Sequence, residues 1–441
     1  MKTPIYDFAK KYAQDDPLRL HMPGHKGQSV LGFEHFDLTE VYGADDLYSS
    51  NGIIEESRLN ACKIFNAQTY YVTEGSSQSI KAMLYLASKG AKNKKILAGR
   101  NAHKSFISGV SLLDLSVEWL YPQEKESYFT CVLSAKEVEK AIIEHNPFAV
   151  YITTPDYLGN QTDVKEISKV CKKHNVLLLV DNAHGAYLKF LSESLHPMDL
   201  GADMCCDSAH KTLSALTGSA YLHINNNINI EKQSVHFALS LFGSSSPSYL
   251  TLISLDKLNA ELSGEYRQKL NSFIEIVNKA KEKLINNGYT LVGKEPLKIT
   301  INAKKYGYMG EELSKILKEK GIVSEFSDAD YLVLMLTVST KEEGVQKLVD
   351  ALISIERKKE ITDKAPKLEK PKKAMDIRSA ILSKSKFLPI AECEGRVLAE
   401  CSVSCPPAVP IVVSGEVIDK SAIECFKYYG IEKCAVVDKQ I

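Results

Sequence analysis

Short apolar runs and longer amphipathic segments alternate along residues 55–224. The runs at 69–73, 148–154 and 176–181 predict strands, and the last is continuously apolar, as in a strand covered on both faces. A helical period follows the first run and returns at 163–174, which predicts helices between the strands. Strands that alternate with helices are typical of a mostly parallel sheet with helices on both faces.

The pattern changes after about residue 260. A long amphipathic segment predicts a helix, and short strands and two further helical segments follow it, which together predict a smaller α+β domain. The Lys- and Pro-rich run behind this domain predicts a solvated linker, and the first 50 residues, rich in His, Gly, Pro and Asp, predict a loop-like arm. We therefore divide the chain into arm, large domain, small domain, linker and C-terminal domain: residues 1–50, 51–260, 261–357, 358–375 and 376–441.

Composition narrows the class of protein. Lys and Arg total 55, as do Asp and Glu, so no global field favours nucleic acid or an anionic membrane as partner. No apolar stretch approaches the roughly 20 residues of a membrane span, and the N-terminus lacks the apolar core of a signal peptide. Ten irregularly spaced cysteines favour reduced thiols and a cytoplasmic protein. Cys401 and Cys405 have no histidine nearby, and we predict no metal site.

Two polar positions follow predicted strands. Asp181 ends the apolar run at 176–181, at the edge of the sheet where ligands of α/β proteins bind, although a strand-ending acid can also simply cap a turn. Gly75, Ser76 and Ser77 lie between a strand and a helix. Their N–H groups and hydroxyls suit a phosphate, and the alternative is an ordinary helix cap.

Lys211 lies in the stretch DSAHKTLSALTGSAYLH, before small and apolar residues. A lysine here is either an exposed loop residue or a lysine that forms an imine with a carbonyl cofactor. Pyridoxal phosphate requires an imine-forming lysine, an acid for its ring nitrogen and a phosphate cup. The order of phosphate turn, Asp181 and Lys211 predicts that cofactor.

The sequence resembles the prokaryotic Orn/Lys/Arg decarboxylases, which are fold-type I pyridoxal-phosphate enzymes. The resemblance is to short bacterial members without an N-terminal wing domain. It implies an aspartate aminotransferase-like large domain with a mostly parallel seven-stranded sheet. The matching stretches span most of the chain: LHMPGHKG (20–27), NAHKSFISG (101–109), DNAHGAYL (181–188), SAHKTLSALTGSAYLH (208–223), SSSPSYL (244–250) and CPPAVP with SGE (405–416).

The resemblance implies roles for individual residues. Lys211 forms the imine, Asp181 pairs with the pyridinium nitrogen, and His103 stacks on the ring. His184 lies near the ring or the imine, although it could instead be a buried structural histidine. The run around Ser245 reaches the phosphate of a neighbouring subunit, so a homodimer with shared sites is expected. The residues expected to hold the phosphate within one subunit are Gly75, Ser76, Ser77, Ser208 and His210.

The implied reaction converts arginine, lysine or ornithine into an amine and carbon dioxide, as in polyamine metabolism. Three positions depart from the family pattern: Asn182 replaces an acid, Glu74 precedes the glycine of the phosphate turn, and Cys405 replaces an aromatic residue. Asp45, Asp46 and Glu74 are candidates for holding the distal cation of the substrate, with surface acids as the alternative.

Two other hypotheses remain open from the sequence. One is a different pyridoxal-phosphate reaction, such as transamination or aldol cleavage. Transamination is disfavoured because Arg267 is the only arginine between residues 260 and 356 that could clamp a carboxylate in the small domain. The other is a diverged regulatory protein, and the intact Lys211, Asp181 and His103 argue against it.

Overall fold

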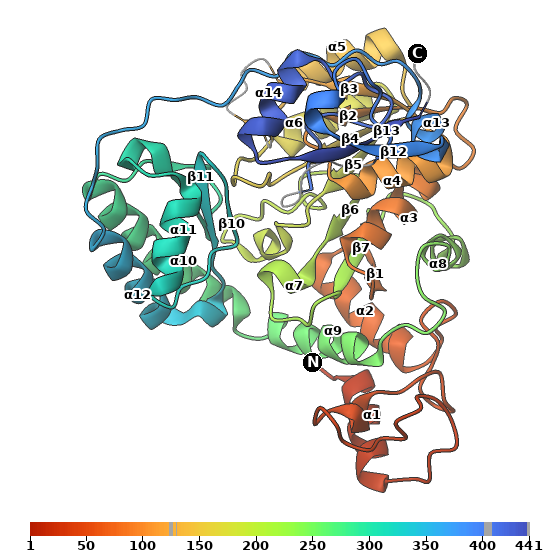
Figure 1. Cartoon of the computed structure of the whole chain (residues 1–441). Coiled ribbons are helices and arrows are strands. Elements are labelled where there is room, and N and C mark those ends of the chain that lie inside the picture. Colours follow the sequence, from red (N-terminus) through yellow and green to blue (C-terminus); the bar gives the residue numbers. More distant parts are fainter. Residues whose placement is uncertain (123–126, 129, 401–407, 439–441) are drawn as a thin grey trace. The chain divides into compact units, whose positions relative to one another are not determined.

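The computed structural model describes residues 1–122, 127–128, 130–400 and 408–438 (Figure 1). It contains a seven-stranded sheet of order β1-β7-β6-β5-β4-β2-β3, in which β7 runs antiparallel to both neighbours. The chain divides into two compact units, Met1–Lys92 with Val164–Asn271, and Asn93–Asp163 with Ser272–Ile441. The mostly parallel α/β architecture predicted from the sequence is confirmed, and the five-part division into domains stays a prediction.

Four strands of the large sheet belong to the first unit. Their continuous apolar burial explains why the sequence showed runs rather than alternation. They are β1 (Gln68–Val72), β5 (Leu177–Asp181), β6 (Met204–Asp207) and β7 (Ala220–Ile224).

The helices of the first unit pack their apolar faces against these strands and against one another. They are α1 (Pro4–Asp15), α2 (Ile53–Phe65), α3 (Ser76–Ser88), α6 (Val164–Lys173), α7 (Ala209–Thr212), α8 (Lys232–Ser240) and α9 (Tyr249–Leu262), with 3-10 turns η1 (Glu34–Phe36) and η2 (Ala186–Phe190). The expectation that residues 1–50 are loop-like throughout is wrong for α1. Pro4 starts this helix, and Ile5 and Ala9 are buried where it contacts α2 and α9.

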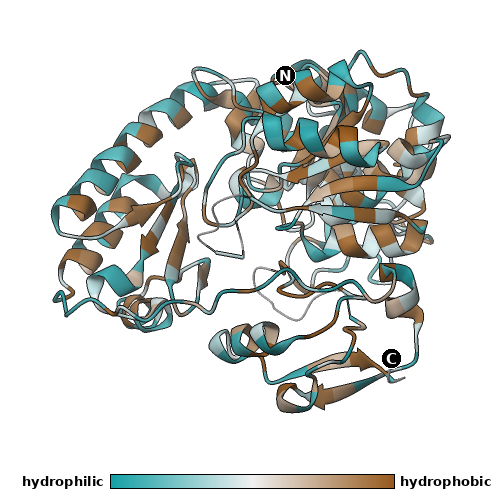
Figure 2. Ribbon diagram, turned by 90° about the horizontal axis from the view of Figure 1, so that it is seen from above, coloured by the Kyte–Doolittle hydropathy of each residue, from teal (hydrophilic) through white to brown (hydrophobic). Residues whose placement is uncertain are grey.

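The second unit holds the other three strands of the large sheet and a smaller sheet. The large-sheet strands β2 (Lys95–Gly99), β3 (Ser116–Leu120) and β4 (Ala149–Thr153) accompany α4 (Lys104–Leu113) and α5 (Ala135–His145). The smaller sheet has the order β10-β11-β9-β8 and is antiparallel, as expected for an α+β domain. Its strands are apolar and its helices are polar on the outside (Figure 2). Helix α10 (Tyr266–Asn286) begins in the first unit and continues into the second. The elements that follow it are β8 (Leu291–Val292), β9 (Lys298–Asn302), η3 (Ala303–Tyr306), α11 (Gly310–Glu319), β10 (Phe326–Ser327), β11 (Tyr331–Met335), η4 (Val338–Thr340) and α12 (Lys341–Ile353).

The C-terminal segment contains a two-stranded antiparallel sheet and two helices. These are α13 (Ile377–Leu382), β12 (Ser385–Pro389), η5 (Ile390–Glu392), α14 (Lys420–Tyr428) and β13 (Lys433–Val437). The β-type runs predicted around 405–416 are not strands where the structure describes them, from 408 onward, although Val412 and Val413 are fully buried. Cys401 and Cys405 lie outside the described residues.

None of the described helices is both long and apolar enough to cross a membrane. The eight cysteines in the described part of the chain are free thiols, seven of them buried.

Candidate active site

Two adjacent loops carry the predicted lysine and aspartate. Strands β5 and β6 run parallel, and Asp181 at the end of β5 is paired in register with Cys206. The chain leaves both strands at the same edge of the sheet, where ligands of open α/β folds bind. Asp181 is 2% exposed, so its carboxylate is held away from bulk water.

Lys211 and His184 meet at the tips of these loops. Lys211 lies on the short helix α7, where its backbone N–H donates to the carbonyl of Ser208. Its Nζ is 3.1 Å from Nε2 of the buried His184, which follows Asp181 by three residues. A hydrogen bond between two nitrogens needs one proton and one lone pair, so the pair can pass a proton from one to the other.

The predicted phosphate turn joins β1 to α3. Gly75 has φ of +69°, which favours glycine, and a Cβ added there would meet nothing within 4 Å. No side chain caps the N-terminus of α3. Ser208 reaches this turn from the lysine loop, since its Oγ donates to Oγ of Ser76 over 2.8 Å. The turn therefore presents hydroxyls and a helix N-terminus to open space, which fits an anion.

Three further hydroxyls, which the sequence motifs do not single out, fit a phosphorylated cofactor. The side-chain oxygens of Thr73, Thr212 and Ser219 are buried and have no hydrogen-bond partner among the described residues. Buried hydroxyls normally have a partner. Thr73 and Thr212 lie within two residues of a predicted site residue. Ser219 is linked to one through its backbone, because its carbonyl accepts from the backbone N–H of His210. In the sequence, only their positions near the glycine turn and the lysine could have pointed to these three residues.

The carbonyl of Ser219 also fixes the side chain of His210. Its ring Nδ1 lies 2.9 Å from Ser219 O, so Nδ1 carries the proton and donates. Burial lowers the pKa of His210, because desolvation disfavours the charged ring.

His103 belongs to the second unit, where it caps α4. Its Nδ1 accepts from the backbone N–H of Ser105 at 3.1 Å and lies 2.9 Å from the hydroxyl of the same residue. Nδ1 is therefore engaged by the cap, which fixes the orientation of the ring. The exposed run around Ser245 lies in the first unit, where the backbone N–H of Ser246 donates to Oγ of Ser244.

The acids proposed for the distal cation have local roles. Asp45 accepts backbone N–H groups at the start of α2, including those of Gly52 and Ile54. Asp46 accepts from the backbone of Tyr48. Both acids are therefore explained by local hydrogen bonds, without a role in holding the substrate. Glu74 is exposed and is the remaining member of that set.

Asn182 has a specific partner. Its Nδ2 donates to Oδ1 of Asp207 over 2.6 Å, and both residues are 0% exposed. An acid in place of Asn182 would set two carboxylates against each other, so Asn182 is the residue that fits beside Asp207 in this chain.

A buried aspartate and a lysine on neighbouring loops, next to a glycine–serine turn at a helix N-terminus, define a class: fold-type I enzymes that depend on pyridoxal phosphate. Comparison with known proteins narrows the class. The Orn/Lys/Arg decarboxylase major domain matches residues 3–301, and the C-terminal domain of the same family matches residues 356–434. The chain therefore belongs to the Orn/Lys/Arg decarboxylase family, and it is a decarboxylase.

Individual relatives agree with this assignment. An arginine decarboxylase from Bacillus subtilis is 29% identical, over 96% of this chain and 92% of the relative. One from Halalkalibacterium halodurans is 28% identical, over 95% of this chain and 92% of the relative. Among solved structures, the lysine decarboxylase of Francisella novicida has a TM-score of 0.81 at 18% identity and covers 99% of this chain and 81% of its own. Lysine decarboxylase A from Pseudomonas aeruginosa has a TM-score of 0.82 at 17% identity, covering 99% and 80%. At these identities the structures establish the fold.

Proposed function

We propose that this protein removes the α-carboxylate of arginine, lysine or ornithine as carbon dioxide and releases the corresponding amine, as a step in polyamine-type metabolism. The observation that carries the proposal is the 3.1 Å contact between Lys211 Nζ and His184 Nε2 beside the buried Asp181. The arginine and lysine decarboxylases among the relatives support a basic amino acid as substrate.

We propose pyridoxal 5′-phosphate as the cofactor, with Lys211 bonded to it in the resting enzyme. When bound, it supplies an electron sink for the pair of electrons left as the carboxylate departs. The phosphate would be held by Gly75, Ser76, Ser77, Ser208 and His210, joined by the unpartnered hydroxyls of Thr73, Thr212 and Ser219.

The residues of this chain supply charge, orientation and a proton. Asp181 offers a buried negative charge that favours a protonated ring nitrogen, because an opposite charge nearby stabilises the charged form. His103 offers a ring face for stacking. Lys211 Nζ and His184 Nε2 are the groups available to hold the proton that returns to the substrate carbon.

Transamination is not favoured by any observation. Arg267, the arginine between residues 260 and 356, donates from Nη2 to the carbonyl of Lys189. Its guanidinium is therefore partly committed to the backbone.

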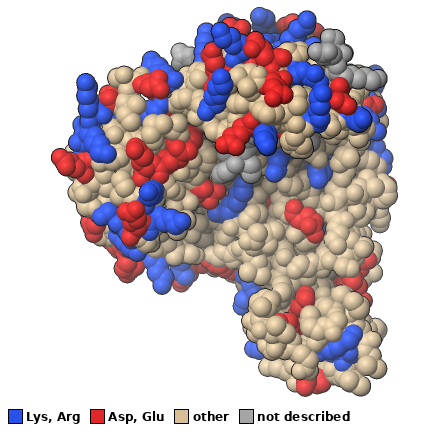
Figure 3. Space-filling model, in the orientation of Figure 1, with Lys and Arg blue, Asp and Glu red and all other residues tan. Residues whose placement is uncertain are grey.

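We also propose a homodimer that shares its active sites. The segment 18–42 exposes large apolar side chains that a lone chain would leave in water. Most of the visible surface around helix α1, at the bottom of the view, is uncharged (Figure 3). These side chains are Leu18, Leu20, Met22, Val30, Leu31, Phe33 and Tyr42. Ser245 would serve the neighbouring site in that dimer. The free thiols support a reducing, cytoplasmic location.

The test is carbon dioxide release from arginine, lysine and ornithine by the purified protein with added cofactor. One of the three should be a clear substrate, and Lys211→Ala should release nothing. The proposal is wrong if none of the three is decarboxylated while the cofactor is bound normally.

A further inference from the structure

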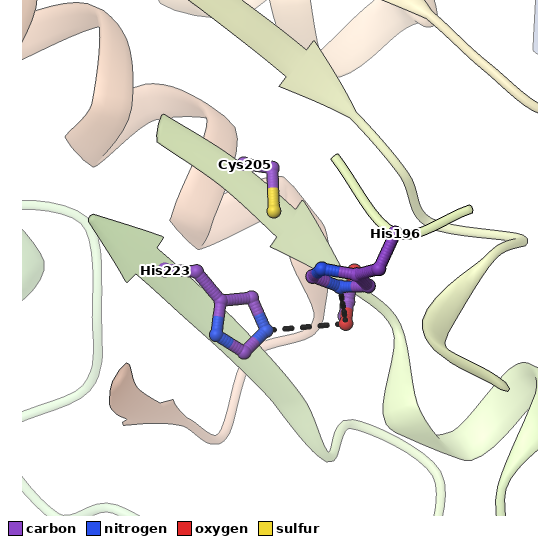
Figure 4. A group of neighbouring side chains, drawn as sticks. His196, Cys205 and His223 are labelled. Carbon is purple, nitrogen blue, oxygen red and sulfur yellow. Dashed lines mark hydrogen bonds and ion pairs between the residues drawn. The ribbon is translucent and has the colours of Figure 1, made fainter. Parts of the chain in front are cut away.

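A buried polar cluster lies at the base of the two loops that follow strands β5 and β6. The carboxylate of Asp207 accepts from His196 Nε2 at 2.9 Å and from His223 Nε2 at 3.1 Å (Figure 4). Its other oxygen accepts from Asn182. All four residues are 0% exposed. A carboxylate with three N–H donors is stable as an anion, even away from water.

The proton positions favour a hydrogen-bonded cluster over a metal centre. Cys205 completes a group of four possible ligands whose atoms lie within 4.8 Å of one another. A metal would need the lone pair of His196 Nε2. However, Nδ1 of that ring faces the backbone N–H of Met198 at 3.4 Å and is the acceptor, which leaves the proton of a neutral ring on Nε2.

The cluster connects the two loops at their roots. Asp207 is the last residue of β6 and precedes Lys211 by four positions, while Asn182 directly follows Asp181. The backbone N–H of Asn182 also donates to Cys206 O at 3.0 Å. The loops are thus joined at the base by Asp207 and Asn182 and at the tips by Lys211 and His184.

We propose that Asn182 and Asp207 are positioning residues, which fix the spacing between the carboxylate of Asp181 and the amine of Lys211. The inference rests on the proposed function, because it assigns the pair to the same site. His196 and His223 hold Asp207 from behind, so the acid cannot turn away from Asn182.

The decisive variant is Asn182→Asp, which sets two carboxylates in contact. We expect the loops 181–186 and 207–213 to exchange backbone hydrogens faster in the cofactor-free protein, because like charges at this distance repel. With cofactor, kcat should fall about 10-fold or more while KM changes little, since a small misplacement of reacting groups is costly. The double variant Asn182→Asp with Asp207→Asn removes the repulsion and should recover to within about 3-fold of the original kcat.

Asp203→Asn is the matched control. Asp203 Oδ2 accepts from the backbone N–H of Leu178 at 2.8 Å and so joins the same two strands at the opposite end from Lys211. This variant should leave exchange in both loops and kcat unchanged. Should Asn182→Asp fail to fold, Asn182→Ala, which only deletes the donor, should give the same faster exchange.

Three results would overturn the proposal. One is unchanged exchange in the loops of Asn182→Asp or, if that variant does not fold, of Asn182→Ala. Another is an equal defect in the single and double variants. The third is one equivalent of zinc in the purified protein. Because exchange is measured without cofactor or substrate, it reports on the positioning role separately from whether Lys211→Ala abolishes decarboxylation.

Discussion

At the scale of single residues, the site consists of Lys211, its partner His184 and the buried Asp181. Lys211 follows a strand end, where a long cationic side chain needs a partner, and His184 supplies one at 3.1 Å. Asp181 adds a carboxylate that is 2% exposed. Because Asp181 is buried, its charge interacts more strongly with its neighbours than it would at the surface.

Replacing Asp181 by Asn tests the charge at unchanged size. An amide cannot balance a positive ring nitrogen, so kcat for whichever of arginine, lysine and ornithine proves to be the substrate should fall by about 100-fold or more. Steady-state kinetics with saturating cofactor measure the effect. Undiminished kcat in Asp181→Asn would remove Asp181 from its proposed role.

Glu74 should weaken cofactor binding through like charge. Its side chain is exposed beside the phosphate turn, so Glu74→Gln should tighten pyridoxal phosphate binding by about 2- to 4-fold at low salt. The gain should vanish at high salt, because exposed charges are screened. Fluorescence titration at two salt concentrations checks this, with Glu394, an exposed acid far from Glu74 in the sequence, changed to Gln as control. If wild type and Glu74→Gln bind pyridoxal phosphate with equal affinity at low salt, Glu74 points away from the phosphate.

At the scale of elements, helix α1 depends on one buried acid. The carboxylate of Asp256 on α9 accepts from the backbone N–H of Tyr6 at 2.9 Å and from the hydroxyl of Ser57 on α2. Burial raises the pKa of Asp256 to about 6, while these two donors oppose the shift. Three helices therefore meet at a group that is more easily protonated than an ordinary aspartate.

The free energy of unfolding should depend on pH because of the raised pKa of Asp256. Because the folded-state pKa lies above the unfolded value, its contribution is fully present below about pH 4 and is lost as the pH rises through about 6. Relative to Asp256→Asn, the wild-type free energy of unfolding should fall by roughly 3 kcal/mol across that window. Urea unfolding of both proteins from pH 4 to 7 measures the difference. A difference that does not change with pH would contradict the raised pKa.

The same elements show what the sequence could and could not predict. The continuous run at 176–181 became β5, and the helical period at 163–174 became α6, because both signals are local. Helix α1 was missed because Ile5 and Ala9 become buried only through contacts with α2 and α9. The partner of Asn182 could not be predicted either, since Asp207 lies 25 residues away on another strand.

At the scale of the whole molecule, the exposed apolar segment 18–42 is the feature that a single chain does not explain. Leu20 is 84% exposed and belongs to a group, whereas Val323 is equally exposed but is far from that group in the sequence. Such a group of exposed apolar side chains supports the proposed dimer interface.

Substitutions in the exposed apolar segment 18–42 test the proposed dimer. Leu20→Ser combined with Leu31→Ser should shift the protein from dimer to monomer in sedimentation velocity, because both side chains lose apolar area that the interface would bury. Val323→Ser is the matched control and should leave the dimer intact. If the wild-type protein sediments as a monomer at the same concentration, the shared-site proposal fails.

The central claim is that Lys211 is the lysine bonded to the cofactor. Borohydride reduction of the purified protein with pyridoxal phosphate, followed by peptide mass spectrometry, tests it directly. The account predicts a pyridoxyl group on the peptide that contains Lys211, and none in the same region of Lys211→Ala. A label on a different lysine, or no stable label in the wild-type protein, would contradict it.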